Sequence, residues 1–199
     1  ILGDVRDYDS VNKAMKGCQS VMHLAALIGI PYSYISPTAY LKTNVEGTLN
    51  VLESAKNLKL KQVIVTSTSE VYGTAIKNKL SEKSELKAQS PYAASKIAAD
   101  QLSLSYFRSF GLPVKIVRPF NTFGPRQSAR AVIPTIITQA LLKNKIKIGN
   151  LHATRDFLYV EDLCSAYEEI LKSNKLLGEV INVGVDSELS IKNLILKIS

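Results

Sequence analysis

Short runs of β-branched and apolar residues alternate with longer amphipathic patterns along almost the whole chain, and this alternation limits the folds open to it. Strands are predicted at 20–25, 62–67, 114–118, 145–148, 157–160 and 179–183. Helices are predicted at 37–58, 90–110, 132–143 and 161–173, with another beginning after Ser190. Strands separated by helices form parallel sheets that helices cover on both faces. We therefore expect an α/β fold with a doubly wound parallel sheet.

Three loops of this predicted sheet carry most of the unusual residues. They follow predicted strands and lie at 25–30, 67–73 and 119–126. In open parallel sheets, ligands bind at the carboxyl ends of the strands, where such loops meet. We therefore expect the functional site at this end of the sheet.

The segment SPYAASKIAADQL contains two residues whose spacing suggests chemistry, Tyr92 and Lys96. Ser90 suits a helix N-cap, Pro91 the first helical position, and Gly111 the helix end. Positions i and i+4 share one helix face, so the phenol and the ammonium can point into one cavity. A tyrosine has a pKa of about 10 in water, and a nearby cation lowers it. Tyr92 could then accept a proton from a sugar hydroxyl; alternatively, the two residues simply lie on the surface of an amphipathic helix.

The composition limits the class of protein. The formal net charge is +8, from 25 basic and 17 acidic residues. Nucleic-acid binding is one explanation of such a charge, but the lysines are scattered and no recognition motif accompanies them, which favours a solvated face. No apolar run reaches the length of a membrane span. Cys18 and Cys164 imply neither a disulfide framework nor a metal site, and we expect core or partly buried thiols in a cytoplasmic protein.

Several segments, in order along the chain, resemble the extended short-chain dehydrogenase/reductases, in their nucleotide-sugar epimerase and dehydratase branch. They are GDVRD (3–7), HLAA (23–26), TNVEGTLNVLESA (43–55), TSTSEVYG (66–73), SPYAASK (90–96), RPFNTFGPRQ (118–127) and RDFLYVEDL (155–163). The resemblance implies a partial Rossmann-like NAD-binding domain at 1–120. It also implies that 121–199 combines the last Rossmann elements with part of a substrate-binding region.

NAD is the cofactor that this resemblance implies. The matching positions are Asp4, Val5, Leu24, Ala25, Ala26, Asn44, Tyr92, Lys96 and Pro119. Asp4 matches a buried carboxylate that contacts adenine, but it could instead cap the helix that begins near Asp7. Asn44 could equally hold the local helix backbone. Small side chains at Ala25 and Ala26 would let the backbone approach the dinucleotide.

The resemblance also implies catalytic roles. Tyr92 matches the catalytic base, Lys96 matches the lysine that binds the nicotinamide ribose and lowers the tyrosine pKa, and Thr68 matches the hydroxyl that bonds the reacting sugar oxygen. Ser69 and Glu70 favour a 4,6-dehydratase over the alternative, a 4-epimerase. Epimerases of this branch have small, unreactive residues at those two positions.

In a dehydratase, Tyr92 would take the C4 hydroxyl proton while hydride leaves C4, and Glu70 would remove the acidic C5 hydrogen. Loss of the C6 hydroxyl as water needs a donor. Dehydratases of dTDP-glucose have Asp where Ser69 stands, whereas GDP-mannose dehydratases are similar to this chain there. Because a serine hydroxyl is a poor acid, Ser69 could relay a proton through water or hold the leaving oxygen. Glu70 could instead be a solvated loop residue.

The substrate is implied to be a nucleotide sugar. Asn121 and Arg155 match positions that face its diphosphate, and Arg126 is a weaker candidate. Arg155 could instead pair with Asp156 or Asp162.

Two longer strings narrow the resemblance. Segments 26–48 and 121–141 are similar to the dehydratases that begin legionaminic acid synthesis from a nucleotide-linked N-acetylglucosamine. The apolar stretch 28–35 could line the sugar pocket or could be packing. The choice between UDP and GDP stays open.

The start of the chain carries a further expectation. The first residue is Ile1, and the family's G-x-x-G-x-x-G phosphate turn does not occur in the sequence. We expect an internal part of a longer protein, with little NAD binding and no turnover by itself. Relatives pair through the helix with Tyr92 and the preceding helix, which implies a homodimer. A non-catalytic member that senses NAD is the remaining alternative, although such proteins lose the tyrosine or lysine that this chain keeps.

Overall fold

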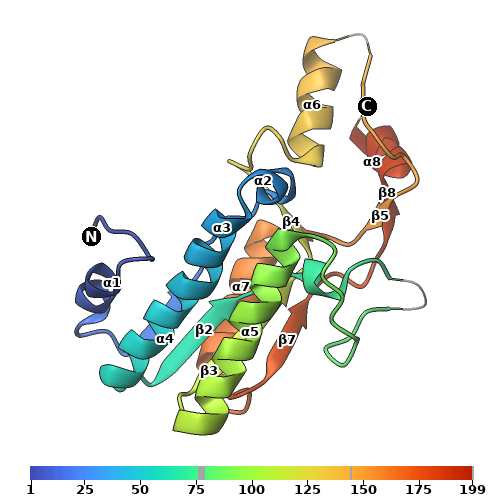
Figure 1. Cartoon of the computed structure of the whole chain (residues 1–199). Helices are drawn as coiled ribbons and strands as arrows, with labels where there is room; N and C mark the ends of the chain where they lie inside the picture. The colour runs from blue at the N-terminus through green and yellow to red at the C-terminus, as the bar shows by residue number, and fades with distance from the viewer. Residues whose placement is uncertain (76–78, 144, 199) are drawn as a thin grey trace. The chain divides into compact units, whose positions relative to one another are not determined.

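The computed structural model describes residues 1–75, 79–143 and 145–198, and Figure 1 follows the chain from end to end. The chain folds into two compact units. The first contains Ile1–Arg118 and Glu169–Asn182, and the second contains Pro119–Glu168 and Val183–Ser199. The predicted boundary at residue 120 between an NAD-binding and a substrate-binding region stays a prediction. The later segment Glu169–Asn182 packs with the first unit.

A four-stranded sheet forms the centre of the first unit. Its strands are β1 (Ser20–His23), β2 (Gln62–Thr66), β3 (Val114–Pro119) and β7 (Val180–Val183), in the order β1-β2-β3-β7. β2 is parallel to both β1 and β3. Successive strand residues point to opposite faces, yet Val63, Ile64 and Val65 are all fully buried. Both faces of the sheet are therefore covered, which confirms the predicted α/β class.

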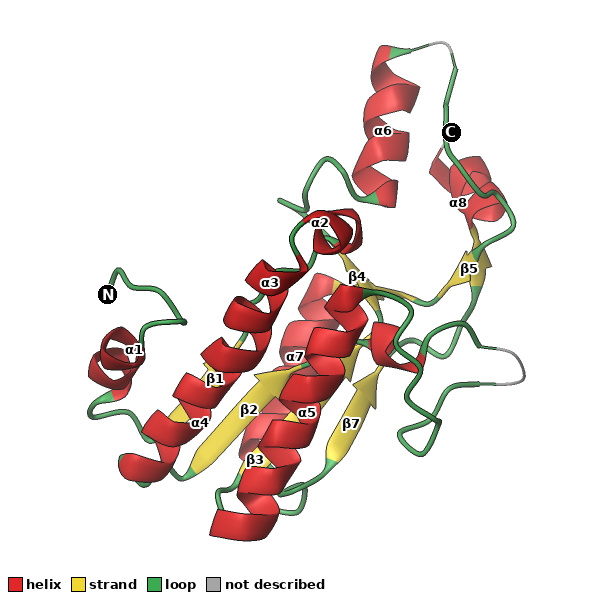
Figure 2. Ribbon diagram, in the orientation of Figure 1, coloured by secondary structure: helices red, strands yellow, loops and turns green. Residues whose placement is uncertain are grey.

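Helices supply this cover. α4 (Gly47–Asn57) and α5 (Pro91–Phe110) lie in front of the sheet in Figure 2. The end of α7 (Val160–Lys172), from Glu169 onward, belongs to the same unit. Leu52 of α4 and Leu104 of α5 pack with Val65 and Ile116 in one core cluster. On the other face, the buried ammonium of Lys115 donates to the backbone oxygens of Ile170 and Ser173 at the end of α7. The cation thus satisfies carbonyls that a helix terminus leaves unpaired.

The rest of the first unit connects these layers. α1 (Tyr8–Met15) precedes β1, and α2 (Ile30–Ile35) follows it. α3 (Pro37–Tyr40) continues through a π-helical segment, η1 (Leu41–Glu46), into α4. A short 3₁₀ helix, η2 (Ser69–Tyr72), follows β2.

Both ends of α5 form as the sequence predicts. The Ser90 hydroxyl accepts a hydrogen bond from the Ala93 amide at 3.1 Å, and Pro91 is the first helical residue. Gly111 ends the helix with a left-handed backbone, at φ 66°. These caps satisfy backbone groups at the two ends of α5.

The second unit has small sheets and its own core. β4 (Asn121–Phe123) pairs in parallel with β6 (Phe157–Tyr159), and β5 (Thr154–Arg155) pairs antiparallel with β8 (Leu189–Ser190). α6 (Val132–Leu142) and α8 (Ile191–Ile198) share a core around Ile136, Ile191 and Leu194. The Ser190 hydroxyl caps α8 by accepting from the Asn193 amide, as its position in the sequence predicts.

Two predictions are wrong. The strand expected at 145–148 does not form in the described part of that segment, because the Gln139 side chain takes up both the amide and the carbonyl of Lys147. Cys18 and Cys164 are exposed instead of lying in the core. Among the described residues, no helix combines the length and apolar character that crossing a membrane requires.

The left-handed backbone of Gly111 gives a stability prediction. A Cβ at this position would meet no atom within 4 Å, so Gly111→Ala tests the backbone strain alone. We expect Gly111→Ala to lower the free energy of unfolding by about 1 kcal/mol. Urea denaturation measures the loss. Gly149→Ala is the matched control, because its Cβ also meets nothing and its backbone lacks a positive φ; equal effects of the two changes would contradict this account.

Candidate active site

The paired side chains of α5 reach the carboxyl end of β2. Tyr92 and Lys96 are 7% and 4% exposed. The Tyr92 phenol is hydrogen-bonded to the Thr68 side chain, and the Lys96 ammonium donates to the backbone oxygen of Thr66 at 2.5 Å. Thr66 and Thr68 are two residues apart at the end of one strand. The i, i+4 spacing therefore directs the phenol and the ammonium to two neighbouring residues at this strand end.

Burial dominates the acid–base behaviour of the pair. Burial raises the pKa of Tyr92 to about 12, although the hydrogen bond from Thr68 opposes this shift. Burial also lowers the pKa of Lys96 to about 8, against the attraction of Asp100. The expectation that Lys96 brings the tyrosine pKa below its usual value is wrong for this chain. The loss of hydration around the phenol outweighs other influences, and the ammonium is directed to the Thr66 carbonyl.

The loop after β2 adds a hydroxyl and a carboxylate. Thr68 is the N-cap of η2, and its hydroxyl accepts from the Glu70 amide at 3.2 Å. Ser69 and Glu70 are half-buried in this turn. The charge of Glu70 contributes to the raised pKa of Tyr92, so the carboxylate lies close to the phenol. The structure thus brings Tyr92, Thr68 and Glu70 together within the first unit.

Asn44 ties the loop after β1 to α5. Its side-chain oxygen accepts from the Leu27 amide at 2.8 Å, and its nitrogen donates to the Leu27 oxygen and the Ser95 hydroxyl, each at 2.9 Å. Asn44 is fully buried and lies in the π-helical segment, a local geometry that is frequent at functional sites. These bonds favour the structural alternative for Asn44, that of holding the local backbone.

His23 was not predicted as part of the site. It is buried at the end of β1, with Nε2 at 3.1 Å from the Thr48 hydroxyl. Because that hydroxyl donates to the Asn44 carbonyl, His23 must be the donor in their bond. Burial, assisted by the Lys96 charge, lowers the pKa of His23 to about 4. The HLAA string marked its position, but no spacing rule indicates that this imidazole faces Lys96.

Of the two predicted cofactor residues near the chain start, Asp4 differs from expectation. Asp4 is exposed, and both of its oxygens accept hydrogen bonds from Arg6. This pairing lowers the pKa of Asp4 to about 2. The prediction of a buried carboxylate is therefore wrong, as is the capping alternative, because Asp7 itself caps α1. Val5 is half-buried and packs against Gly47. A Cβ added to Gly47 would lie only 2.7 Å from the Val5 side chain.

The loop at the carboxyl end of β1 offers a surface for a flat ligand. Leu24 and Ala25 are exposed, and Ala26 is half-buried. A large apolar side chain beside two alanines leaves both side-chain surface and backbone accessible. This chemistry fits one side of a dinucleotide. Pro119 ends β3 and is half-buried.

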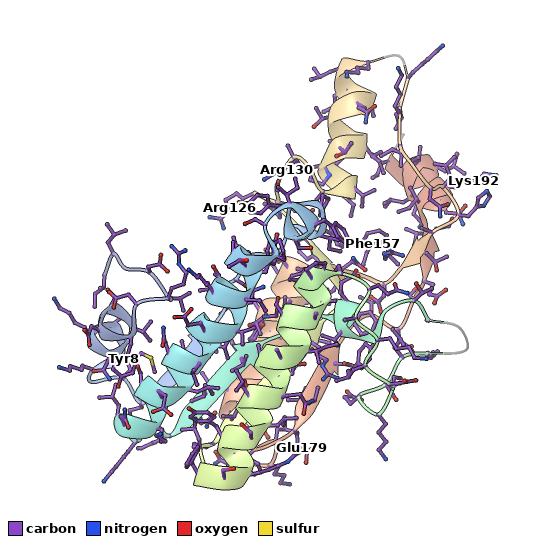
Figure 3. The ribbon with its side chains drawn as sticks, in the orientation of Figure 1. Tyr8, Arg126, Arg130, Phe157, Glu179 and Lys192 are labelled. Atoms are coloured by element: carbon purple, nitrogen blue, oxygen red, sulfur yellow. The ribbon has the colours of Figure 1, made fainter. Side chains whose placement is uncertain are left out.

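The predicted diphosphate residues all lie in the second unit. Asn121 begins β4, and its amide donates to the Asp156 backbone oxygen. Arg155 is exposed on β5 and donates to the Thr154 backbone oxygen. Arg126 is exposed on the loop before α6 (Figure 3). Its backbone is left-handed, at φ 67°. The Asp156 carboxylate instead accepts from the amides of Val185 and Asp186.

Comparisons with known proteins agree with this architecture. A protein-family model described as GDP-mannose 4,6 dehydratase matches residues 1–199. A dTDP-D-glucose 4,6-dehydratase from Dictyostelium discoideum is 39% identical over 182 residues, which cover 85% of this chain and 42% of that protein.

Two solved structures are similar along nearly the whole chain. DesIV, a dTDP-glucose 4,6-dehydratase from Streptomyces venezuelae crystallised with NAD, has a TM-score of 0.93 at 30% identity, covering 98% of this chain and 61% of DesIV. A UDP-N-acetylglucosamine 4-epimerase from Methanobrevibacter ruminantium has a TM-score of 0.92 at 34% identity, covering 98% of this chain and 64% of the epimerase. The chain thus spans about 60% of the length of these two proteins.

The lowered pKa of Lys96 predicts a specific pH dependence of stability. A lysine in the unfolded chain titrates near 10.4, whereas Lys96 in the folded chain titrates at about 8. Between these values the unfolded state binds more protons, so the wild type gains stability as pH rises. We expect the stability of Lys96→Met relative to wild type to fall by about 2 kcal/mol from pH 7 to pH 10.

Urea denaturation of both proteins at several pH values measures this change. Lys13→Met removes an exposed lysine from α1 and serves as the control. Parallel pH curves for wild type and Lys96→Met would show that the buried ammonium does not titrate as described.

Proposed function

This chain belongs to the GDP-mannose 4,6 dehydratase family, and from that membership we propose that the whole protein is an NAD-dependent nucleotide-sugar 4,6-dehydratase. The observation that carries the proposal is the position of Glu70, in the turn whose Thr68 is hydrogen-bonded to Tyr92. A phenol, a hydroxyl and a carboxylate in one place suit a reaction that removes two different protons from one sugar.

The exposed loop after β1 and the buried Lys96 have the chemistry that parts of NAD require. We propose that Leu24, Ala25 and Ala26 lie along the dinucleotide, with Pro119 near the nicotinamide and Lys96 at its ribose. Asp4 and Val5 stay candidates for the adenine, although Arg6 would have to share or release the Asp4 carboxylate. NAD bound there would supply a hydride acceptor and donor for the sugar and positive charge near the phenol. That charge matters because burial otherwise keeps Tyr92 protonated at neutral pH.

The side chains then divide the proton transfers. The Thr68 hydroxyl donates a hydrogen bond that stabilises ionised Tyr92. The phenolate then takes the proton of the C4 hydroxyl as C4 is oxidised. The resulting 4-keto sugar has an acidic C5 hydrogen, which the Glu70 carboxylate removes. The C6 hydroxyl leaves as water, with Ser69 holding the leaving oxygen or relaying a proton through water. The product is a 4-keto-6-deoxy sugar.

A nucleotide-linked N-acetylglucosamine is the substrate that we propose. Ile28, Tyr32, Tyr34 and Ile35 of the apolar stretch 28–35 are exposed. Their exposure supports a role in lining a sugar pocket over a role in packing. Asn121, Arg126 and Arg155 are proposed to bind the diphosphate, since a guanidinium fork suits phosphate oxygens.

A 4-epimerase is the second candidate, because the relative from Methanobrevibacter ruminantium is a UDP-N-acetylglucosamine 4-epimerase. An epimerase has no need of a carboxylate that removes the C5 proton, so Glu70 distinguishes the two reactions. A non-catalytic NAD sensor has less support, because Tyr92 and Lys96 are both present and share one strand end. We further propose a cytoplasmic homodimer that pairs through α4 and α5.

The reaction predicts a defined product. We expect the whole protein, incubated with NAD and UDP- or GDP-linked N-acetylglucosamine, to yield a product lighter by one water, measured by mass spectrometry. A dTDP-glucose incubation tests the sugar preference. An isomer of unchanged mass would instead identify the 4-epimerase.

Glu70→Gln tests the role of the carboxylate. We expect this change to lower formation of the 4-keto-6-deoxy product by about 100-fold or more, since an amide cannot accept the C5 proton. Oxidation at C4, followed by the NADH absorbance, should persist. Glu85→Gln is the control, because Glu85 is an exposed residue that pairs with Lys87. Unchanged dehydration by Glu70→Gln would refute the role given to Glu70.

A further inference from the structure

A third buried titratable residue, Asp100, follows the two catalytic candidates along α5. Tyr92, Lys96 and Asp100 are each four residues apart, so they lie along one face of the helix at steps of about 6 Å. All three are buried, and Asp100 is fully so. The reaction described above uses the first two residues and leaves Asp100 without a role.

Arg118 of β3 fixes the Asp100 carboxylate in the core. Its Nε and Nη2 atoms lie 3.0 Å and 2.9 Å from Asp100 Oδ2, and the two side chains are 3% and 0% exposed. Arg118 also donates to the Tyr72 hydroxyl at 2.8 Å, and that hydroxyl donates to Asn182 Oδ1 at 2.7 Å. Because Tyr72 belongs to η2, the same network supports the turn that carries Glu70.

The buried Lys96 ammonium needs a negative charge nearby. A buried cation without a counter-charge loses its proton readily. The oxygen that Lys96 binds directly is the neutral Thr66 carbonyl. Around it, His23 is neutral at the end of β1, Tyr92 is a phenol, and Glu70 faces the phenol from η2. Asp100 is the carboxylate whose charge favours the protonated form of Lys96.

We propose that Asp100 is a positioning residue of the reaction: clamped by Arg118, its carboxylate supplies the fixed negative charge that keeps the buried Lys96 protonated at working pH. The inference rests on the proposed function, because a charged Lys96 is needed for the ribose binding assigned to it and for proton transfer to Tyr92. It assigns to the Asp100–Arg118 pair a purpose beyond core stability, which a buried ion pair supplies poorly.

Direct titration of Lys96 tests the proposal. In protein labelled with ¹³C-lysine, the Cε chemical shift of Lys96, assigned by loss of its signal in Lys96→Arg, reports the protonation of the amine. We expect Asp100→Asn to move the midpoint to lower pH by about one unit. The alkaline limb of the dehydration pH profile should move in the same direction, and Asp100→Glu should restore both.

Two further variants separate charge from packing. Tyr72→Phe breaks the links to Arg118 and Asn182 without altering charge, so it should lower stability and leave the Lys96 midpoint in place. If Asp100→Asn fails to fold because Arg118 is left unpaired, the double variant Asp100→Asn with Arg118→Gln replaces it. Because removing the Arg118 cation also changes the charge around Asp100, this double variant is compared with Arg118→Gln alone, and it should show the lower Lys96 midpoint of the two.

The outcomes distinguish failure of the role proposed for Asp100 from failure of the proposed dehydratase function. An unchanged Lys96 midpoint in a folded Asp100→Asn or double variant overturns the role of Asp100. A midpoint that moves equally in Tyr72→Phe also overturns it, since packing alone would then explain the shift. The titration needs no substrate, so it stands apart from the proposed function, which fails if the wild-type protein forms no dehydrated product.

Discussion

Burial of the first turns of α5 against the end of β2 is the constraint on which the candidate site depends. It removes water from the Tyr92 phenol and the Lys96 ammonium, and it leaves each with one defined partner, Thr68 and the Thr66 carbonyl. The same burial raises one pKa and lowers the other. The isolated chain thus holds a neutral phenol beside an ammonium, and added positive charge is what would turn that phenol into a base.

Several surrounding contacts preserve this arrangement. Asn44 joins the loop after β1 to α5 through Leu27 and Ser95. Arg118 joins β3 to α5 and to η2 through Asp100 and Tyr72. Each link is made by hydrogen bonds between polar groups that are mostly buried, and such bonds are strong in an environment of low dielectric constant. The loop that carries Ala25 is therefore bonded to α5 through Asn44, and the turn that carries Glu70 is bonded to α5 through Arg118.

Local sequence rules predicted a large part of the fold because they act over a few residues. The caps of α5, the β-branched strand at 62–66 and the N-cap at Ser190 all depend on near neighbours. The rules failed where a side chain bonded to a nearby group that no periodic pattern indicates. Gln139 took up the backbone of Lys147, and Arg6 occupied the carboxylate of Asp4, and neither event has a periodic signature.

The sequence by itself determined the α/β class, the family and the i, i+4 pairing of Tyr92 with Lys96, because periodicity and motif order are properties of the chain alone. Only the tertiary structure decided that these groups are desolvated, that the Lys96 charge lowers the pKa of His23, that the Asp100 charge favours protonated Lys96, and that Arg118 pairs with Asp100. The physical reason is that dielectric environment and charge proximity depend on which distant segments pack together. A pKa therefore cannot be derived from spacing along one helix.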